Sequence, residues 1–163
     1  MNNKIKYGQF YTTNYSYILQ GLNIPNNITN IIEPFAGKCD LLNFVDKDKF
    51  IIECYDIDPQ NDYTIKRDTL MDPPNLKNKF ILTNPPYLAR NKNKDKILYD
   101  KYNCNDLYKC FIEILIKNNC QGGIIIIPLN FISSVRKKDI DLRKRFILKY
   151  DIIKLNIFEE KSI

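Results

Sequence analysis

Short apolar runs alternate with segments of helical periodicity from residue 30 onward, and this alternation most restricts how the chain can fold. It is typical of βαβ units, in which crossover helices join parallel strands. The sequence therefore predicts an α/β fold, a Rossmann-like, doubly wound and mostly parallel sheet. We expect strands over 31–32, 50–55, 63–66, 80–83, 124–127 and 152–158, a helix capped by Asp40, and helices over 105–117 and 139–149.

Length and composition predict one globular domain. The chain has 163 residues, of which 44% are hydrophobic and 27% charged, enough for one core but not for a full second domain. We expect a single domain over 1–163, with an N-terminal segment over 1–29 and an α/β core over 30–163. No apolar run reaches the roughly 20 residues of a membrane span, and no secretory signal is present. The expected location is therefore cytoplasmic.

The residue types that are missing exclude several kinds of chemistry. The chain has no His, which rules out Ser-His-Asp catalysis and His-ligated metals within it. Its five cysteines form no CxxC pair and no metal-ligand spacing, so we expect free thiols in a reducing compartment and no metal. They are Cys39, Cys54, Cys104, Cys110 and Cys120.

A net charge of +6 favours a polyanionic partner, nucleic acid first. The abundance of Asn, Ile and Lys, which have AT-rich codons, offers a different explanation for that charge. Two basic clusters, within 89–101 and 136–145, have two interpretations each: contacts to phosphates or a solvated surface. Residues 89–104 are expected to form an exposed, mobile loop.

Four polar segments follow predicted strands, at 33–40, 56–58, 67–70 and 84–87. Ligands of open parallel sheets bind at the carboxyl ends of strands, so these segments predict a binding site. The first contains one glycine and neither GxGxxG nor GK[ST], which disfavours a triphosphate. Asp56 follows Glu33 by 23 residues, near the spacing at which a carboxylate accepts ribose hydroxyls. This spacing fits the binding of an adenosine cofactor. The alternative is that Asp56 is only a turn residue before Pro59.

Asn84-Pro85-Pro86-Tyr87 is the most specific segment. Consecutive prolines fix the backbone, so the Asn amide oxygen and a Pro carbonyl present two acceptors to one amine. An exocyclic amine is a poor nucleophile because its lone pair is delocalised, and two acceptors stabilise the charge that develops on methylation. The Tyr ring can stack on an extruded base. The alternative is an Asn- and Pro-rich turn without chemistry.

In this order the segments resemble the S-adenosylmethionine-dependent N6-adenine DNA methyltransferases of the gamma motif order, over residues 5–160. Residues 8–13 resemble their first cofactor-contact motif, and 122–131 their supporting strand motif. The resemblance implies S-adenosyl-L-methionine as cofactor, adenine in DNA as target and a restriction-modification role. It further implies the catalytic residues Asn84, Pro85, Pro86 and Tyr87 and the cofactor-binding residues Tyr11, Thr12, Glu33, Pro34, Phe35, Ala36, Gly37, Asp56, Ile57, Asp68, Thr69 and Asn84, with no metal ligand.

The chain departs from the family pattern in two places. Cys39 stands where a second glycine is common, and a side chain there is expected to crowd the cofactor or strain the backbone. The family's seventh, antiparallel strand and target-recognition region do not fit after Ile163. We therefore expect a second subunit, or a second copy of the chain, to cover the 152–158 edge strand and supply recognition.

Three alternatives remain open. Methyltransferases acting on guanine N2 in rRNA and on glutamine in release factors share a similar Asn-Pro-Pro-aromatic loop. Residues 8–13, together with the lack of an N-terminal helical domain, argue against the glutamine enzymes. The third alternative is a non-catalytic or remnant subunit that keeps the fold and acts in binding or assembly. Cys39 and the missing C-terminal region support it.

Overall fold

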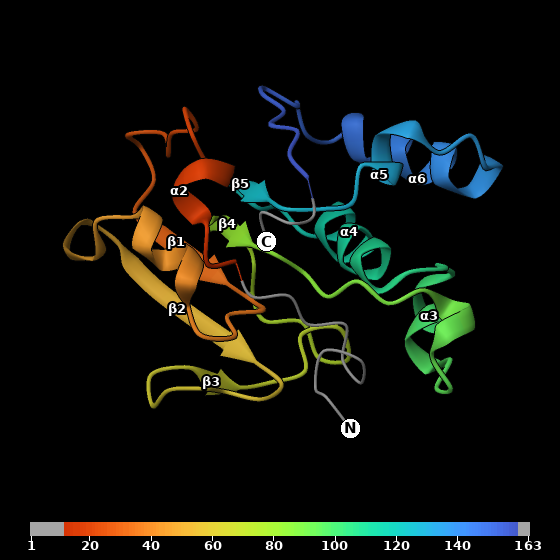
Figure 1. Cartoon of the computed structure of the whole chain (residues 1–163), viewed down its shortest axis with the longest axis horizontal. Coiled ribbons are helices and arrows are strands. Elements are labelled where there is room, and N and C mark those ends of the chain that lie inside the picture. Colours follow the sequence, from red (N-terminus) through yellow and green to blue (C-terminus); the bar gives the residue numbers. More distant parts are fainter. Residues whose placement is uncertain (1–11, 160–163) are drawn as a thin grey trace.

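The computed structural model describes residues 12–159, and its centre is a five-stranded sheet in which every pair is parallel (Figure 1). This confirms the predicted α/β class. The strand order is β3-β2-β1-β4-β5. The strands are β1 (Asn30–Glu33), β2 (Ile51–Asp56), β3 (Ile65–Lys66), β4 (Phe80–Thr83) and β5 (Gly122–Ile125).

The strand order reverses between β1 and β4. The chain builds outward from β1 through β2 to β3, then returns to place β4 on the other side of β1. Ile31 and Ile32 of β1 lie opposite Phe80 and Ile81 of β4. The loops that leave the two strands diverge at their carboxyl ends, which is where open α/β sheets bind ligands.

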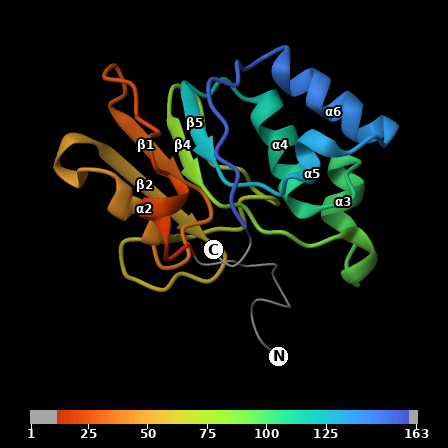
Figure 2. The same cartoon turned by 45° about the horizontal axis from the view of Figure 1, so that its top comes forward.

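Two apolar clusters cover the two faces of the sheet. Because successive side chains of a strand point to opposite faces, neighbours in one strand enter different clusters. Ile32 and Ile81 pack with α4 (Leu107–Lys117) and Leu142 of α6 (Lys137–Ile147), whereas Ile31 packs with α2 (Tyr15–Ile18). Figure 2 shows the sheet between these layers. The other helices are α3 (Ile97–Tyr102), α5 (Asn130–Ser133), η1 (Asp40–Phe44), η2 (Lys47–Lys49) and η3 (Arg90–Lys92). No helix in the described part of the chain is long and apolar enough to cross a membrane.

The strand predicted over 124–127 begins earlier, at Gly122. Gly123 lies beside Ile81 in the ladder, and a Cβ atom there would stand 2.8 Å from the Ile81 carbonyl oxygen. The two glycines therefore belong to the strand, because only a residue without a side chain allows this approach to β4.

The sixth predicted strand, over 152–158, is wrong. Residues 151–159 run without regular structure and pair with no strand in the described chain. Side chains hold this segment instead: Asn156 Nδ2 donates to the carbonyl oxygens of Ile18 (2.9 Å) and Gln20 (3.0 Å). Alternating apolar residues predict a strand only where a neighbouring backbone can pair with it.

Residues 89–104 are also not the exposed loop that we expected. They contain η3 and α3, and Tyr99 and Tyr102 of α3 are buried. The Tyr99 hydroxyl donates to the Leu88 carbonyl at 2.9 Å, and the Tyr102 hydroxyl to the Leu70 carbonyl at 2.7 Å. These two tyrosines anchor the segment, and its many lysines obscured their spacing in the sequence.

The helix expected after Asp40 is shorter and tighter than predicted. Asp40 is the first residue of the 3-10 helix η1, and the preceding residue, Cys39, has a left-handed backbone conformation with φ of 63°. A side chain in this region costs about 1 kcal/mol. The expected backbone strain at Cys39 is therefore present.

Candidate functional site

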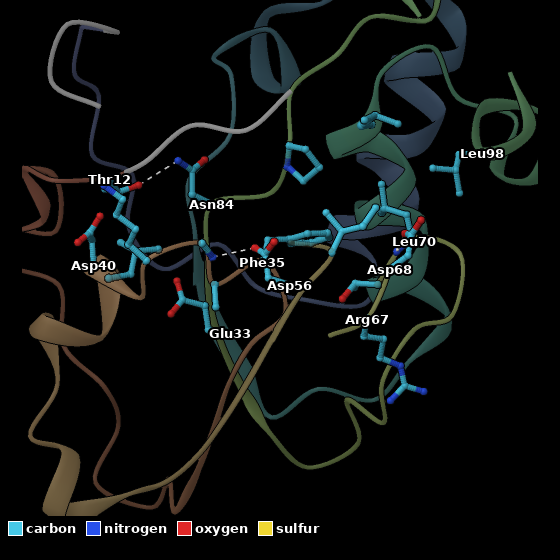
Figure 3. A pocket seen from close by; sticks show the side chains of 18 of the residues that line it. Thr12, Glu33, Phe35, Asp40, Asp56, Arg67, Asp68, Leu70, Asn84 and Leu98 are labelled. Atoms are coloured by element: carbon cyan, nitrogen blue, oxygen red, sulfur yellow. Dashed lines mark hydrogen bonds between the residues drawn. The ribbon is translucent and has the colours of Figure 1, made fainter. Parts of the chain in front are cut away.

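A cavity of about 390 Å³ opens at the carboxyl ends of the central strands (Figure 3). Its volume falls within the range of small-ligand sites, roughly 300–1,000 Å³. The loops after β1, β2, β3 and β4 all contribute to its wall. Of the residues predicted from the sequence, the cavity is lined by Thr12, Glu33, Phe35, Ala36, Gly37, Asp56, Ile57, Asp68, Thr69, Asn84 and Pro86.

Some predicted residues do not line the cavity. Pro34, Pro85 and Tyr87 lie outside the lining, although Pro34 and Tyr87 make contacts with residues that belong to it. Tyr11 lies outside the described residues. Four further lining residues belong to the segments predicted to form the site: Lys38, Asp40, Arg67 and Leu70. The lining residues that were not predicted are Leu41, Asn93, Asp95, Leu98 and Leu107, and no sequence pattern marked those of the 89–104 segment.

Asp56, the last residue of β2, ties the glycine loop to the sheet. Its Oδ2 accepts the Gly37 backbone N–H at 2.7 Å, and its Oδ1 accepts the Asp58 backbone N–H at 2.8 Å. Burial raises the pKa of this carboxyl, and the backbone N–H groups oppose that shift. A carboxylate oxygen accepts two hydrogen bonds, so contact with a ligand hydroxyl is compatible with these backbone bonds. Asp56 can therefore hold the turn at the end of β2 and contact a ligand at the same time.

The segment after β3 forms a turn that supports the same loop. Asp68 Oδ1 accepts the backbone N–H groups of Leu70 and Met71, both at 3.1 Å. The Thr69 hydroxyl donates to the Pro34 carbonyl at 2.7 Å. These bonds join the loops after β1 and β3 on the same wall of the cavity.

Glu33, at the end of β1, is buried, with 1% of its surface exposed. Its Oε2 has no hydrogen-bond partner among the described residues. Burial raises the pKa of Glu33 well above its usual value, and the acidic groups of Cys39, Asp40 and Asp56 add to the shift. A cationic group beside Glu33 would remove this electrostatic penalty.

Asn84 directly follows β4 and is joined to the N-terminal part of the chain. Its Nδ2 donates to the Thr12 hydroxyl at 2.9 Å (Figure 3). The Tyr87 hydroxyl lies beside Asn84 Oδ1 and 2.6 Å from the Ile126 carbonyl oxygen. A hydroxyl has one proton, so Tyr87 donates to one of these acceptors at a time. Burial raises the pKa of Tyr87 and keeps that proton in place.

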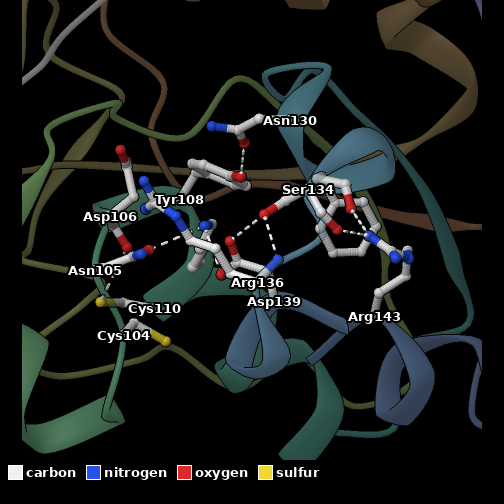
Figure 4. Close-up of polar contacts among 12 residues, drawn as sticks. Cys104, Asn105, Asp106, Tyr108, Cys110, Asn130, Ser134, Arg136, Asp139 and Arg143 are labelled. Atoms are coloured by element: carbon white, nitrogen blue, oxygen red, sulfur yellow. Dashed lines mark hydrogen bonds and ion pairs between the residues drawn. The ribbon is translucent and has the colours of Figure 1, made fainter. Parts of the chain in front are cut away.

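Behind Tyr87 lies an aromatic contact that the sequence did not indicate. The rings of Tyr87 and Tyr108 meet edge to face with centroids 6.1 Å apart. Tyr108 is fully buried in α4, and its hydroxyl donates to Asn130 Oδ1 of α5 (Figure 4). This contact couples the Asn-Pro-Pro-Tyr segment to the helical layer.

Part of the predicted basic cluster over 136–145 has a structural role. Arg143 Nη1 donates to the Phe131 carbonyl at 2.8 Å, and Arg145 pairs with Glu113 of α4. Nearby, Lys109 and Asp139 form a buried ion pair at 2.7 Å (Figure 4). These contacts join α4, α5 and α6, so the charges that make them serve packing.

Cys39, the residue at the usual glycine position, does not line the cavity. Its side chain is 2% exposed and lies against Asn61 and Thr64. The expected crowding of the cofactor is therefore not observed, whereas the left-handed backbone is.

A parallel sheet of this strand order, with a cavity at the reversal between β1 and β4, is a Rossmann-like fold of the methyltransferase type. Residues 9–163 match the Eco57I restriction-modification methylase family, and the chain belongs to that family. Its members are DNA methyltransferases of restriction-modification systems. No curated protein matches the chain.

Proposed function

We propose that the protein binds S-adenosyl-L-methionine in this cavity and transfers its methyl group to N6 of adenine in DNA. The observation that carries the proposal is the position of Asn84. Its carboxamide stands at the end of β4 and lines the same cavity as the acidic residues that follow β1, β2 and β3. An acceptor for an amine thus faces a site suited to a nucleoside cofactor.

The donors and acceptors of the cavity fit this cofactor. Glu33 brings a buried carboxyl oxygen without a partner among the described residues, which suits the ammonium group of the methionine moiety. Asp56 suits the ribose hydroxyls. Phe35, Ile57 and Leu98 supply apolar surface for a purine. When bound, the cofactor supplies an electrophilic methyl group on a sulfonium centre.

The other residues predicted to bind the cofactor would contact it from the loop after β3 and from the N-terminal segment. Asp68 and Thr69 would face the cofactor adenine from the loop after β3, which their bonds to Leu70 and Pro34 hold rigid. Thr12, and Tyr11 next to it in sequence, would contact the cofactor from the N-terminal segment. Thr12 is buried and bonded to Asn84, so this segment would link the cofactor site to the catalytic turn.

The catalytic step rests on Asn84 Oδ1 and the Pro85 carbonyl oxygen. Both accept hydrogen bonds from the exocyclic amine of an extruded adenine, and they stabilise the positive charge on N6 as the methyl group is transferred. The proton leaves after the attack, so no histidine is required. Pro86 keeps the turn rigid. Asn84 Oδ1 has two lone pairs, so it can receive the amine beside the Tyr87 hydroxyl, and it offers both once that hydroxyl turns to the Ile126 carbonyl.

The test uses labelled methyl groups and panels of DNA, RNA and protein substrates, followed by digestion and identification of the methylated product. We expect N6-methyladenine from DNA. Asn84→Ala should lower the rate about a hundredfold or more and leave cofactor binding nearly unchanged. The exposed Asn91→Ala is the matched control.

The methylated product distinguishes the alternative functions. Methylated RNA or glutamine would support the corresponding alternative enzymes. Cofactor binding without transfer to any substrate would support a non-catalytic subunit. Full activity of the Asn84 variant would contradict the mechanism.

We also propose a second polypeptide, or a second copy, as a partner in target recognition. The support is an apolar surface on residues 152–157, where Ile153 is 90% exposed and Ile157 73%. Mass measurement by light scattering, with and without DNA, tests this. A monomer that binds one DNA sequence specifically would contradict it.

A further inference from the structure

Three potential metal ligands that are distant in sequence converge between β1 and the start of η1. They are Glu33 at the end of β1, Cys39 in the following loop and Cys54 in β2. The two sulfur atoms and a carboxylate oxygen all lie within 4.8 Å of one another. Parallel pairing accounts for part of this, because Glu33 lies opposite Cys54 in the register of β1 and β2.

All three side chains are removed from solvent. Glu33 is 1% exposed, Cys39 2% and Cys54 4%. Glu33 Oε2 has no hydrogen-bond partner among the described residues. A buried polar atom without a partner costs about 1–3 kcal/mol, so it calls for a ligand that balances it.

The surroundings of Cys39 favour its thiolate, the form in which cysteine binds metals. Asn61 Nδ2 donates to Cys39 Sγ at 3.4 Å. The other end of the Asn61 amide is fixed, because its Oδ1 accepts the backbone N–H and the hydroxyl of Thr64. Outer groups that orient a ligand in this way are a regular feature of metal sites.

The direction in which the pKa of Cys39 shifts agrees with a thiolate at this position. A hydrogen bond from Cys54, with a further contribution from Asn61, lowers the pKa of Cys39 to about 5 against the effect of burial. The same Cys39 contact, together with burial, raises the pKa of Cys54. Burial raises that of Glu33.

We propose that Cys39 Sγ, Cys54 Sγ and the Glu33 carboxylate form a binding site for one thiophilic divalent cation of the zinc type. Two sulfurs and one oxygen suit zinc, whereas magnesium and calcium prefer oxygen ligands alone. A three-residue set leaves the fourth tetrahedral position to water. Cysteine and carboxylate ligands bind metals in their deprotonated forms, so any proton that these groups hold is released on binding.

A disulfide between Cys39 and Cys54 would explain why the two cysteines lie together, but not why Glu33 lies beside them. It would leave Glu33 Oε2 without a partner, and it requires an oxidant. A cation satisfies all three groups at once. Because Glu33 also lines the large cavity, the cation would sit at its wall and couple metal binding to the shape of the glycine loop.

The experiment uses Co²⁺ as a spectroscopic substitute for Zn²⁺ on the reduced, metal-free full chain. We expect one equivalent of Co²⁺ to produce thiolate-to-cobalt charge-transfer absorption that Zn²⁺ abolishes. Cys39→Ser and Cys54→Ser should remove this absorption, and Glu33→Gln should weaken binding at least tenfold. Cys104→Ser is the matched control, because its sulfur lies outside the cluster and donates to the Tyr102 carbonyl.

A second measurement needs no substitution and so does not depend on the folding of variants. Zn²⁺ should slow alkylation of Cys39 and Cys54 at least tenfold, measured by mass spectrometry, and leave Cys104 and Cys120 unchanged. Absence of the cobalt–thiolate band, or equal protection of all cysteines, would overturn the proposal. Neither readout involves methyl transfer. Glu33 also serves the proposed cofactor site, so Cys39→Ser and Cys54→Ser, which leave Glu33 in place, separate metal binding from cofactor binding.

Discussion

Asn84 and Thr12 are joined by a hydrogen bond of 2.9 Å between Asn84 Nδ2 and the Thr12 hydroxyl, although 72 residues separate them in the chain. The bond uses one of the two amide hydrogens of Asn84, so the carboxamide oxygen is directed away from Thr12. In the proposed mechanism that oxygen receives the target amine. Thr12 therefore sets the orientation of the Asn84 side chain.

Replacement of Thr12 tests this orientation. Thr12→Val keeps the shape but removes the acceptor, and we expect methyl transfer to fall about tenfold, equivalent to about 1.4 kcal/mol. Stability should fall by about 1 kcal/mol. Single-turnover kinetics and urea unfolding measure the two effects. Thr13→Val, at the exposed neighbouring position, should change neither.

The Tyr87 hydroxyl and the Tyr87 ring are expected to have opposite effects. Tyr87→Phe keeps the ring and removes the hydroxyl that lies beside Asn84 Oδ1, so methyl transfer should be retained or increased. Tyr87→Ala also removes the stacking surface, worth about 1–3 kcal/mol per base. It should impair capture of the extruded base, which fluorescence of 2-aminopurine at the target reports. A Phe variant as impaired as the Ala variant would contradict this division of roles.

Asp56 should matter for cofactor binding more than for folding of the sheet. Asp56→Ala removes the acceptor for the Gly37 N–H and the proposed contact with the ribose. We expect cofactor binding to weaken by about 1.5–3 kcal/mol in calorimetry, and the rise in Tm on adding cofactor to shrink accordingly. Asp62→Ala, at an exposed position, is the control. If the Asp56 variant binds the cofactor with unchanged affinity, the role of Asp56 is only to hold the turn after β2.

The buried ion pair between Lys109 and Asp139 should be a major determinant of stability. Its side chains are 4% and 7% exposed, so removal of one partner leaves a buried charge and should cost about 3–5 kcal/mol. Lys109→Met and Asp139→Asn test this by urea unfolding, and the double variant should lose less than the sum. Asp141→Asn breaks an exposed pair with Arg145 and should cost about 0.5 kcal/mol or less. Equal losses in the two pairs would contradict the argument.

Much of the site could be predicted because its residues follow strands directly. Glu33, Asp56 and Asn84 each end or follow a strand, and parallel strands bring their carboxyl ends to one edge. The part of the cavity wall that Asn93, Asp95 and Leu98 form could not be predicted in this way. It depends on how Tyr99 and Tyr102 anchor a lysine-rich segment, and no local pattern specifies those partners.

The amino-acid sequence by itself determined the parallel α/β class, the order of the polar segments and the rigid Asn-Pro-Pro-Tyr segment after a strand, because strand periodicity and proline geometry are local properties. The tertiary structure decided which segments pair. It left 152–158 outside the sheet, and it drew Gly123 into β5, where Ile81 leaves no room for a side chain. It also brought Cys39 and Cys54 to Glu33, although the cysteine spacing showed no metal pattern. Backbone pairing and side-chain convergence depend on distant partners, so the spacing of residues along the chain cannot specify them.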